Sequence, residues 1–318
     1  MSEAKSGSTR PRWRKWLKRI LISLAIIIVV LVFGVLPYLF SVLVTSAGTR
    51  PMDRALTETP ADYGLEFKDV EFRTSDGIVI SAWFIPSKSK QTTIVYSHGL
   101  FRSRRELLDR AMNLCKRGYG ALLYDERNHG SSGHARSTLG YFERLDVEAA
   151  VRYIREAAAP QDHIVTLGVS MGATADLLAA AETPQIEAVV ADSSFLSFDD
   201  TVAHHLKLFF RLPRFPIGSE IEFFIEKRGH FDGDKLNALE AVKRIGDRPI
   251  LFIAGEHDRR MPPDIARTLY DASSSPRRDL LIIDGEATKI HGHAYMAEPD
   301  LYVDRVSAFL DSRLGVAK

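Results

Sequence analysis

The chain has 318 residues, of which 45% are hydrophobic and 26% are charged, a composition that excludes a disordered protein. Its 42 basic and 41 acidic residues leave a formal charge of +1, so no overall field favours a nucleic acid partner. The single cysteine, Cys115, excludes an internal disulfide framework and a cysteine-based metal cluster. The sequence therefore predicts a globular domain with a large core, and we expect Cys115 on the buried face of a helix.

The N-terminal segment has the pattern of a membrane anchor. No charged residue occurs between Ile20 and Thr49, and this apolar run exceeds the about 20 residues that cross a bilayer core. Two tryptophans and six basic residues precede it: Trp13, Trp16, Arg10, Arg12, Arg14, Lys15, Lys18 and Arg19. Because such basic residues stay on the cytoplasmic side, we expect residues 1–19 in the cytoplasm, a transmembrane helix over residues 20–46 and the remainder on the extracytoplasmic side. A cleaved signal peptide is the alternative, although its apolar region is usually shorter.

The residues after the anchor predict a linker and then an antiparallel hairpin. Residues 47–64 are polar and contain prolines, which is typical of a linker. Residues 65–74 and 78–86 alternate apolar and polar positions on either side of the turn sequence SDG. This alternation predicts two antiparallel strands that open a domain over residues 65–318.

The rest of the chain alternates between buried-type strands and helices. Short apolar runs occur at residues 92–97, 120–125, 163–170, 186–193, 249–255 and 279–284. Helical patterns separate most of them, most clearly in residues 145–158, where Val147, Ala150, Val151 and Ile154 share one face. We therefore predict an α/β fold with a mostly parallel central sheet flanked by helices.

Ser170 is the centre of a Gly-x-Ser-x-Gly sequence at the end of a predicted strand and the start of a predicted helix. Glycines at 168 and 172 permit a tight turn that holds the serine hydroxyl at the top of the sheet. A nucleophilic serine needs a base and an acid that orients the base, and in this context they follow in the order acid, then histidine. Asp258 and His291 follow two late strands in that order, so we predict a catalytic triad of Ser170, His291 and Asp258.

Two of these assignments have rivals. His293 lies close to His291, and Asp192 follows the preceding strand, from which a carboxylate reaches the same imidazole in some proteins of this type. We expect His293 to be solvated or to contact a cap, and Asp192 to cap a turn.

The loop after the strand at 92–97 predicts an oxyanion hole. Gly99 lets the backbone turn so that the N–H of Leu100 points into the site, where the N–H of Met171 joins it. His98 precedes the nucleophile in the chain, the wrong order for a base in this context. We expect it to pack and form hydrogen bonds beneath the loop.

Five stretches of the chain together resemble the α/β-hydrolase superfamily: YSHGLF, LLYDERNHGSSG, GVSMGA, GEHDRRMPP and HGHAYMAEPDLYVDRVSAFL. The resemblance covers roughly residues 65–310 and is to the serine-aminopeptidase-like and dienelactone-hydrolase-like branch of ester hydrolases. It implies the same catalytic Ser170, Asp258 and His291, and it favours His291 over His293 through the pattern H-x-x-A-Y. Asn128 is a departure, because the family usually has glycine there.

Residues 195–240 interrupt the alternation of strands and helices and are rich in phenylalanine and leucine. The resemblance implies a small helical cap here, inserted after the sixth strand and over the active site. Its apolar faces then line an acyl-binding pocket or touch lipid, or the cap only packs on the domain.

The sequence thus predicts a membrane-anchored serine hydrolase that cleaves carboxylic esters, with lipid or acyl esters among its substrates, through an acyl-enzyme intermediate. A peptidase or thioesterase with the same triad, and a non-catalytic membrane-bound binding protein, are the alternatives. We expect no cofactor and no metal, because neither the pair His291 and His293 nor the pair His204 and His205 has a third ligand at zinc-like spacing. Arg102, Arg104 and Arg105 predict a solvated helix start, or else a contact with an anionic substrate or headgroup.

Overall fold

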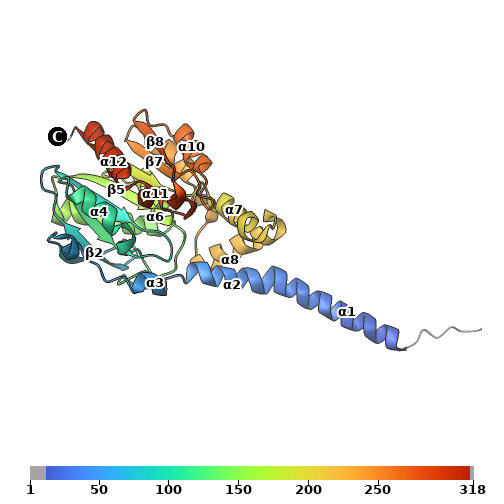
Figure 1. Cartoon of the computed structure of the whole chain (residues 1–318). Coiled ribbons are helices and arrows are strands. Elements are labelled where there is room, and N and C mark those ends of the chain that lie inside the picture. Colours follow the sequence, from blue (N-terminus) through green and yellow to red (C-terminus); the bar gives the residue numbers. More distant parts are fainter. Residues whose placement is uncertain (1–11, 316–318) are drawn as a thin grey trace, which may run out of the picture.

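The computed structural model describes residues 12–315 of the chain (Figure 1). Residues 1–11, which include Arg10 and most of the predicted cytoplasmic segment, lie outside the described residues.

One long apolar helix leads into the domain. It comprises α1 (Arg12–Val30), a π-helical turn η1 (Leu31–Val35) and α2 (Leu36–Thr45), and it projects away from the body of the protein (Figure 1). Within its 33 residues from Trp13 to Thr45, an 18-residue stretch reaches a mean hydropathy of 3.1, and only 6% of that stretch is buried. Among the described residues this is the one helix long and apolar enough to cross a membrane.

The segment predicted as a linker contains two short helices, α3 (Pro51–Arg54) and η2 (Pro60–Tyr63), and lies against the domain. Thr49 Oγ1 donates to the carbonyl of Arg102 at 2.7 Å and accepts from the amide of Gly130 at 2.8 Å. These bonds fix the end of the apolar helix relative to two loops at the top of the sheet.

Eight strands form one twisted sheet. They are β1 (Lys68–Arg73), β2 (Val79–Ile85), β3 (Thr92–Ser97), β4 (Gly120–Tyr124), β5 (His163–Val169), β6 (Ala188–Asp192), β7 (Ile250–Gly255) and β8 (Arg278–Ile283). Their order is β1-β2-β4-β3-β5-β6-β7-β8, in which β1 and β2 pair antiparallel and β3 to β8 run parallel. The predicted mostly parallel sheet opened by a hairpin is confirmed.

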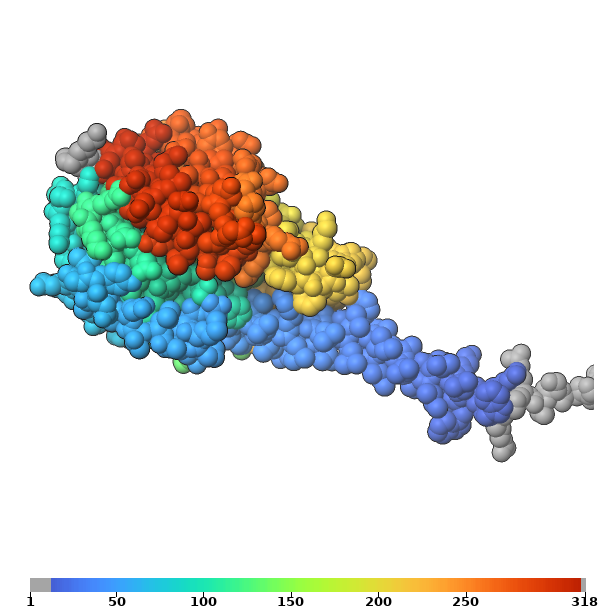
Figure 2. Space-filling view, in the orientation of Figure 1, coloured from blue at the N-terminus to red at the C-terminus, as the bar shows by residue number. Residues whose placement is uncertain are grey.

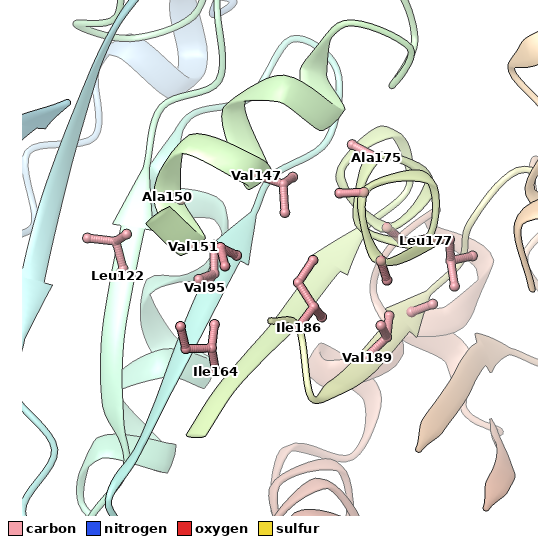
Figure 3. Packing of buried hydrophobic residues seen from close by; sticks show 14 of the residues in the cluster. Val95, Leu122, Val147, Ala150, Val151, Ile164, Ala175, Leu177, Ile186 and Val189 are labelled. Atoms are coloured by element: carbon pink, nitrogen blue, oxygen red, sulfur yellow. The ribbon is translucent and has the colours of Figure 1, made fainter. Parts of the chain in front are cut away.

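Helices cover both faces of the sheet. One face holds η3 (Arg104–Leu107), α4 (Leu108–Cys115), η7 (Glu286–Lys289), α11 (Ala294–Ala297) and α12 (Pro299–Leu314). The other holds α5 (Glu143–Tyr153) with its π-helical end η4 (Ile154–Ala158), α6 (Met171–Glu182), α9 (Ala238–Arg244) and α10 (Pro263–Ala272). Figure 3 shows Val147, Ala150 and Val151 of α5 packed beside α6 and over the strands, and these residues are buried as their spacing predicts. Cys115 is also buried, as expected, and burial raises the pKa of its thiol to about 12.

The cap segment lies between β6 and β7. It contains α7 (Phe198–Phe210), η5 (Arg214–Gly218), α8 (Ser219–Gly229) and η6 (Gly233–Lys235). Helix α8 packs on α2, and α7 lies next to α8, on the side from which the apolar helix leaves the body (Figures 1 and 2).

Candidate active site

Ser170 occupies a strained turn between β5 and α6. Its φ of 57° and ψ of −116° lie in a region that residues with a side chain rarely adopt. Close packing enforces the turn, because a Cβ on Gly172 would lie 2.1 Å from the carbonyl oxygen of Ser97 and one on Gly168 would lie 2.5 Å from the amide of Ala173. The two glycines therefore let the backbone pack closely enough to present the Ser170 hydroxyl above the sheet.

The structure brings Ser170, His291 and Asp258 into one hydrogen-bonded chain. His291 Nε2 lies 2.8 Å from Ser170 Oγ, and His291 Nδ1 lies 2.7 Å from Asp258 Oδ2. Asp258 comes from the loop after β7 and His291 from the loop after β8, so the carboxyl ends of three parallel strands supply the three side chains. The arrangement has the contacts that a nucleophile, a base and an orienting acid require.

Asp258 is held in the ionised state. Its Oδ1 accepts hydrogen bonds from the amides of Arg260 at 2.8 Å and Met261 at 3.0 Å. Burial by itself raises the pKa of this carboxyl, but the hydrogen bond and charge of His291 together with the two amides outweigh it, and the pKa lies below its ordinary value. A carboxylate then faces Nδ1 of His291, which fixes the proton on that nitrogen and leaves Nε2 free to accept from Ser170.

His293 and Asp192 do not take part in this chain. Among the described residues, His293 makes no hydrogen bond to Ser170 or Asp258, and burial followed by the charges of Arg102 and Arg110 lowers its pKa. Asp192 does not cap a turn as predicted, because its Oδ2 binds Arg110 and the Tyr302 hydroxyl, each at 3.2 Å. Arg110 is itself buried, and it needs this carboxylate as its counter-ion.

Two backbone amides near Ser170 have no hydrogen-bond partner among the described residues. Neither the N–H of Leu100 nor that of Met171 donates a hydrogen bond to any group in the described part of the chain. The Leu100 loop runs close to Ser170, since a Cβ on Gly99 would lie 3.7 Å from Ser170 Cβ. Amides left without partners beside a serine hydroxyl are suited to stabilise an oxyanion.

His98 and His129 support that loop from below. His98 Nε2 accepts from the amide of Glu126 at 3.0 Å, so its Nδ1 carries the proton and donates to the Gly99 carbonyl at 2.8 Å. His129 Nε2 likewise accepts from the amide of Phe101 at 3.2 Å. Burial and the neighbouring His129 lower the pKa of His98 to about 3, which keeps it neutral. The predicted packing role of His98 is confirmed.

The arginines after Leu100, at positions 102, 104 and 105, do not form a solvated patch. Arg104 is buried, pairs with Asp125 at 2.8 Å and stacks on Trp83 at 4.9 Å, so the predicted solvated helix start is wrong for this residue. No pattern in the sequence indicates these contacts, because Asp125 follows β4 and Trp83 lies in β2. Asn128 departs from the glycine that the family usually has at this position. Its φ is 66°, a left-handed conformation that asparagine tolerates.

An apolar pocket of about 230 Å³ opens at Ser170. It is lined by Leu100 and Phe101 of the loop after β3, by cap residues that include Val202 and Leu206, and by residues of α2. Arg260 is the one charged residue in the lining, and no carboxylate of the described residues contributes to it. The participation of α2 was not anticipated from the sequence, because the helix lies far from Ser170 along the chain.

Comparisons with known proteins agree with the fold. A family model described as serine aminopeptidase, S33, matches residues 88–217, which include Ser170 but end before Asp258 and His291. The uncharacterized protein YqkD of Bacillus subtilis is 27% identical over 74% of this chain and 76% of its own. The polyketide transferase ATR5 of Stachybotrys chlorohalonatus is 35% identical over 41% of this chain and 46% of its own.

A solved structure is similar over most of the domain. The Pyrococcus furiosus esterase Pf2001 superimposes with a TM-score of 0.69 at 28% identity, and the match covers 84% of this chain and 98% of the esterase. The strand order, the strained serine and these similarities together show that the chain is a hydrolase of the α/β-hydrolase superfamily.

Proposed function

We propose that the protein is a membrane-anchored serine hydrolase that cleaves carboxylic esters, with Ser170 as nucleophile, His291 as general base and Asp258 as the orienting acid. The observation that carries the proposal is the pair of hydrogen bonds, 2.8 Å and 2.7 Å long, that link Ser170 through His291 to Asp258. Alignment of this kind lets the imidazole accept the serine proton as the hydroxyl attacks.

Acylation follows from these contacts. Ser170 Oγ attacks the ester carbonyl carbon while His291 Nε2 takes the hydroxyl proton, and the carbonyl oxygen becomes an oxyanion held by the amides of Leu100 and Met171. Asp258 stabilises the imidazolium that forms. When the tetrahedral intermediate collapses, His291 returns the proton to the departing alkoxide, which leaves as an alcohol, and the acyl group stays on Ser170.

Deacylation repeats the steps with water. His291 Nε2 takes a proton from a water molecule, whose oxygen attacks the acyl carbon and forms a second oxyanion in the same pair of amides. Collapse breaks the bond to Ser170 Oγ, which recovers its proton from His291, and the carboxylic acid is released.

The pocket lining favours ester substrates over peptides with a free amino terminus. An aminopeptidase needs a carboxylate that binds the free ammonium group of its substrate, and the described lining instead contains Arg260 among mostly apolar side chains. An acyl chain fits this lining, because burial of each methylene contributes about 0.8 kcal/mol.

The apolar N-terminal helix is proposed to anchor the protein, with the basic segment in the cytoplasm and the domain on the other side of the membrane. Its length and exposed apolar surface support the anchor, and the basic residues before it support the orientation. Protease added to intact cells should degrade the domain in this orientation and spare it in the opposite one.

The proposed activity is tested on the full-length protein in detergent with p-nitrophenyl esters from acetyl to palmitoyl. Wild type should turn over at least part of this series and be labelled by a serine-reactive phosphonate, and Ser170→Ala should lose both properties. Equal turnover of aminoacyl amides would favour the peptidase alternative. Absence of both turnover and labelling in the wild type would favour the binding protein.

A further inference from the structure

The apolar helix is longer than a bilayer requires, and its last turns pack on the domain. At 1.5 Å per residue its 33 residues span about 50 Å, whereas about 20 residues cross the hydrocarbon core. Side chains from Trp13 to Leu31 are exposed, but Pro37, Ser41, Val44 and Thr45 of α2 are buried. Their spacing places them on one face of α2, so this end of the helix packs against protein while the earlier turns stay free for lipid.

Polar contacts hold this end of the helix in place. Arg228 of α8 donates from Nε to Thr45 Oγ1 at 3.2 Å, and its guanidinium lies 5.3 Å from the centre of the Tyr38 ring. The amide of Ser137 donates to the carbonyl of Thr45 at 3.0 Å. The helix end is therefore attached both to the cap and to the loop after β4.

This docked end forms a wall of the pocket that contains Ser170. Phe40, Leu43 and Val44 of α2 line the pocket opposite cap residues Phe209 and Phe210 of α7. Helix α2 is thus both the end of the proposed anchor and a part of the proposed acyl-binding site.

The cap exposes aromatic side chains beside the same helix. Phe209 and Phe210 are 57% and 58% exposed although they line the pocket, so they mark its mouth. Phe215 and Phe223 are 78% and 47% exposed on the neighbouring η5 and α8. Figure 2 shows the cap on the side from which the apolar helix leaves the body, which brings these rings to the level of the membrane surface if the helix crosses a bilayer.

The charges near these rings suit a lipid surface. Lys207 and Arg211 are exposed on either side of Phe209 and Phe210 in the chain, and Arg214 is paired with Asp199 at 2.9 Å and Glu222 at 3.2 Å. Exposed aromatic rings interleaved with basic residues are typical of segments that sit in the interface of a membrane with anionic headgroups.

We propose that the cap face of Phe209, Phe210, Phe215 and Phe223 inserts into the bilayer interface, so that the pocket opens directly to the membrane and admits long-chain acyl esters dissolved in it. The inference rests on the proposed hydrolase function and names the substrate class for the same site. The acyl chain enters between α2 and α7, with its carbonyl at Ser170, and the cap phenylalanines replace water at the entrance with apolar surface.

The insertion is tested with single-cysteine variants of the full-length protein in vesicles of phosphatidylcholine and phosphatidylglycerol. Cys115 is buried, so Phe215→Cys or Phe223→Cys gives one accessible thiol for an environment-sensitive dye. Spin-labelled lipid should quench the dye at both positions. Leu301→Cys is the matched control, because Leu301 is an exposed apolar residue of α12 on the body of the domain, and it should not be quenched. Quenching at 215 and 223 no stronger than at 301 would overturn the proposal.

Activity provides the second test. The double variant Phe215→Ser, Phe223→Ser should turn over a palmitoyl ester carried in vesicles about tenfold more slowly, because the two rings no longer hold the mouth in the interface. Neither residue lines the pocket, so turnover of water-dissolved p-nitrophenyl acetate should stay at the wild-type rate, as should both activities of Leu301→Ser. If activity depends on Ser170 but not on Phe215 and Phe223, the membrane entrance is wrong while the hydrolase proposal stands. Activity that survives Ser170→Ala would remove the proposed function itself.

Discussion

The backbone carbonyl of Asp192 accepts a hydrogen bond from the amide of Ser170 at 2.9 Å, while the carboxylate of Asp192 binds Arg110 and the Tyr302 hydroxyl. Asp192 therefore supports the turn that carries Ser170 without bonding to His291. This relationship separates the two acidic residues that the sequence offers as partners of the histidine, because only Asp258 lies within hydrogen-bond distance of the imidazole.

Asp258→Asn and Asp192→Asn should fail in different ways. Asp258→Asn removes the charge that orients and stabilises the imidazolium, so kcat should fall about 10³- to 10⁴-fold with little change in melting temperature. Asp192→Asn leaves Arg110 buried without a counter-ion, which should destabilise the fold by about 3 kcal/mol while the folded fraction keeps most of its kcat. Thermal melts and active-site titration separate the two effects. A large loss of kcat per labelled site in Asp192→Asn would transfer the role of the acid to that residue.

Gly172→Ala should disrupt the turn at Ser170. The added methyl group would lie 2.1 Å from the Ser97 carbonyl oxygen, so β3 and the start of α6 must move apart. We expect loss of esterase activity and a melting temperature lower by several degrees, corresponding to about 1–3 kcal/mol. Gly34→Ala is the control, because no atom lies within 4 Å of the Cβ that it adds. Wild-type activity in Gly172→Ala would show that the turn does not depend on this close approach.

The sheet and the hydrogen-bonded chain at Ser170 could be predicted from local patterns. Each strand is a short apolar run, and the carboxyl ends of β5, β7 and β8 must meet at one edge of a parallel sheet, which brings Ser170, Asp258 and His291 together. The order of the three residues in the chain, serine before acid before histidine, then selected Asp258 and His291.

Contacts between distant segments were not predictable in this way. Arg104 and Asp192 each have a buried ionic partner on another element, and no spacing in the sequence marks such pairs. The docking of α2 on the cap was hidden for a different reason. Hydropathy does not distinguish the turns of an apolar helix that face lipid from those that face protein. Phe40 and Val44 were therefore assigned to the membrane anchor from the sequence.

His98 should make the stability of the fold depend on pH. Above about pH 6.5 the residue is neutral in both the folded and the unfolded chain, because its pKa is about 3 when folded and 6.5 when unfolded. As the pH falls below 6.5 the unfolded chain takes up a proton that the folded chain does not, so stability declines by about 1.4 kcal/mol per pH unit until the pH approaches 3. Melting temperatures from pH 7 to pH 4 should therefore fall less steeply in His98→Gln than in wild type. The exposed His230→Gln is the control and should keep the wild-type slope, and an equal slope in all three proteins would contradict the buried neutral state of His98.

Val44→Trp should shorten the range of acyl chains that the protein accepts. Val44 is buried on the face of α2 that lines the pocket, and an indole there occupies space in a cavity of about 230 Å³. The ratio of kcat/KM for palmitoyl ester to that for acetyl ester should fall by about tenfold or more, since each excluded methylene forfeits about 0.8 kcal/mol of burial.

Leu39→Trp is the matched control, because Leu39 lies on the same helix, is exposed and does not line the pocket. Melting curves of Val44→Trp serve to measure the loss of stability, about 1–3 kcal/mol, that overpacking at this position should cause. Identical chain-length profiles for the two variants would show that α2 anchors the protein without shaping its acyl site, whereas a shift confined to Val44→Trp would establish that the anchor helix contributes to substrate selection.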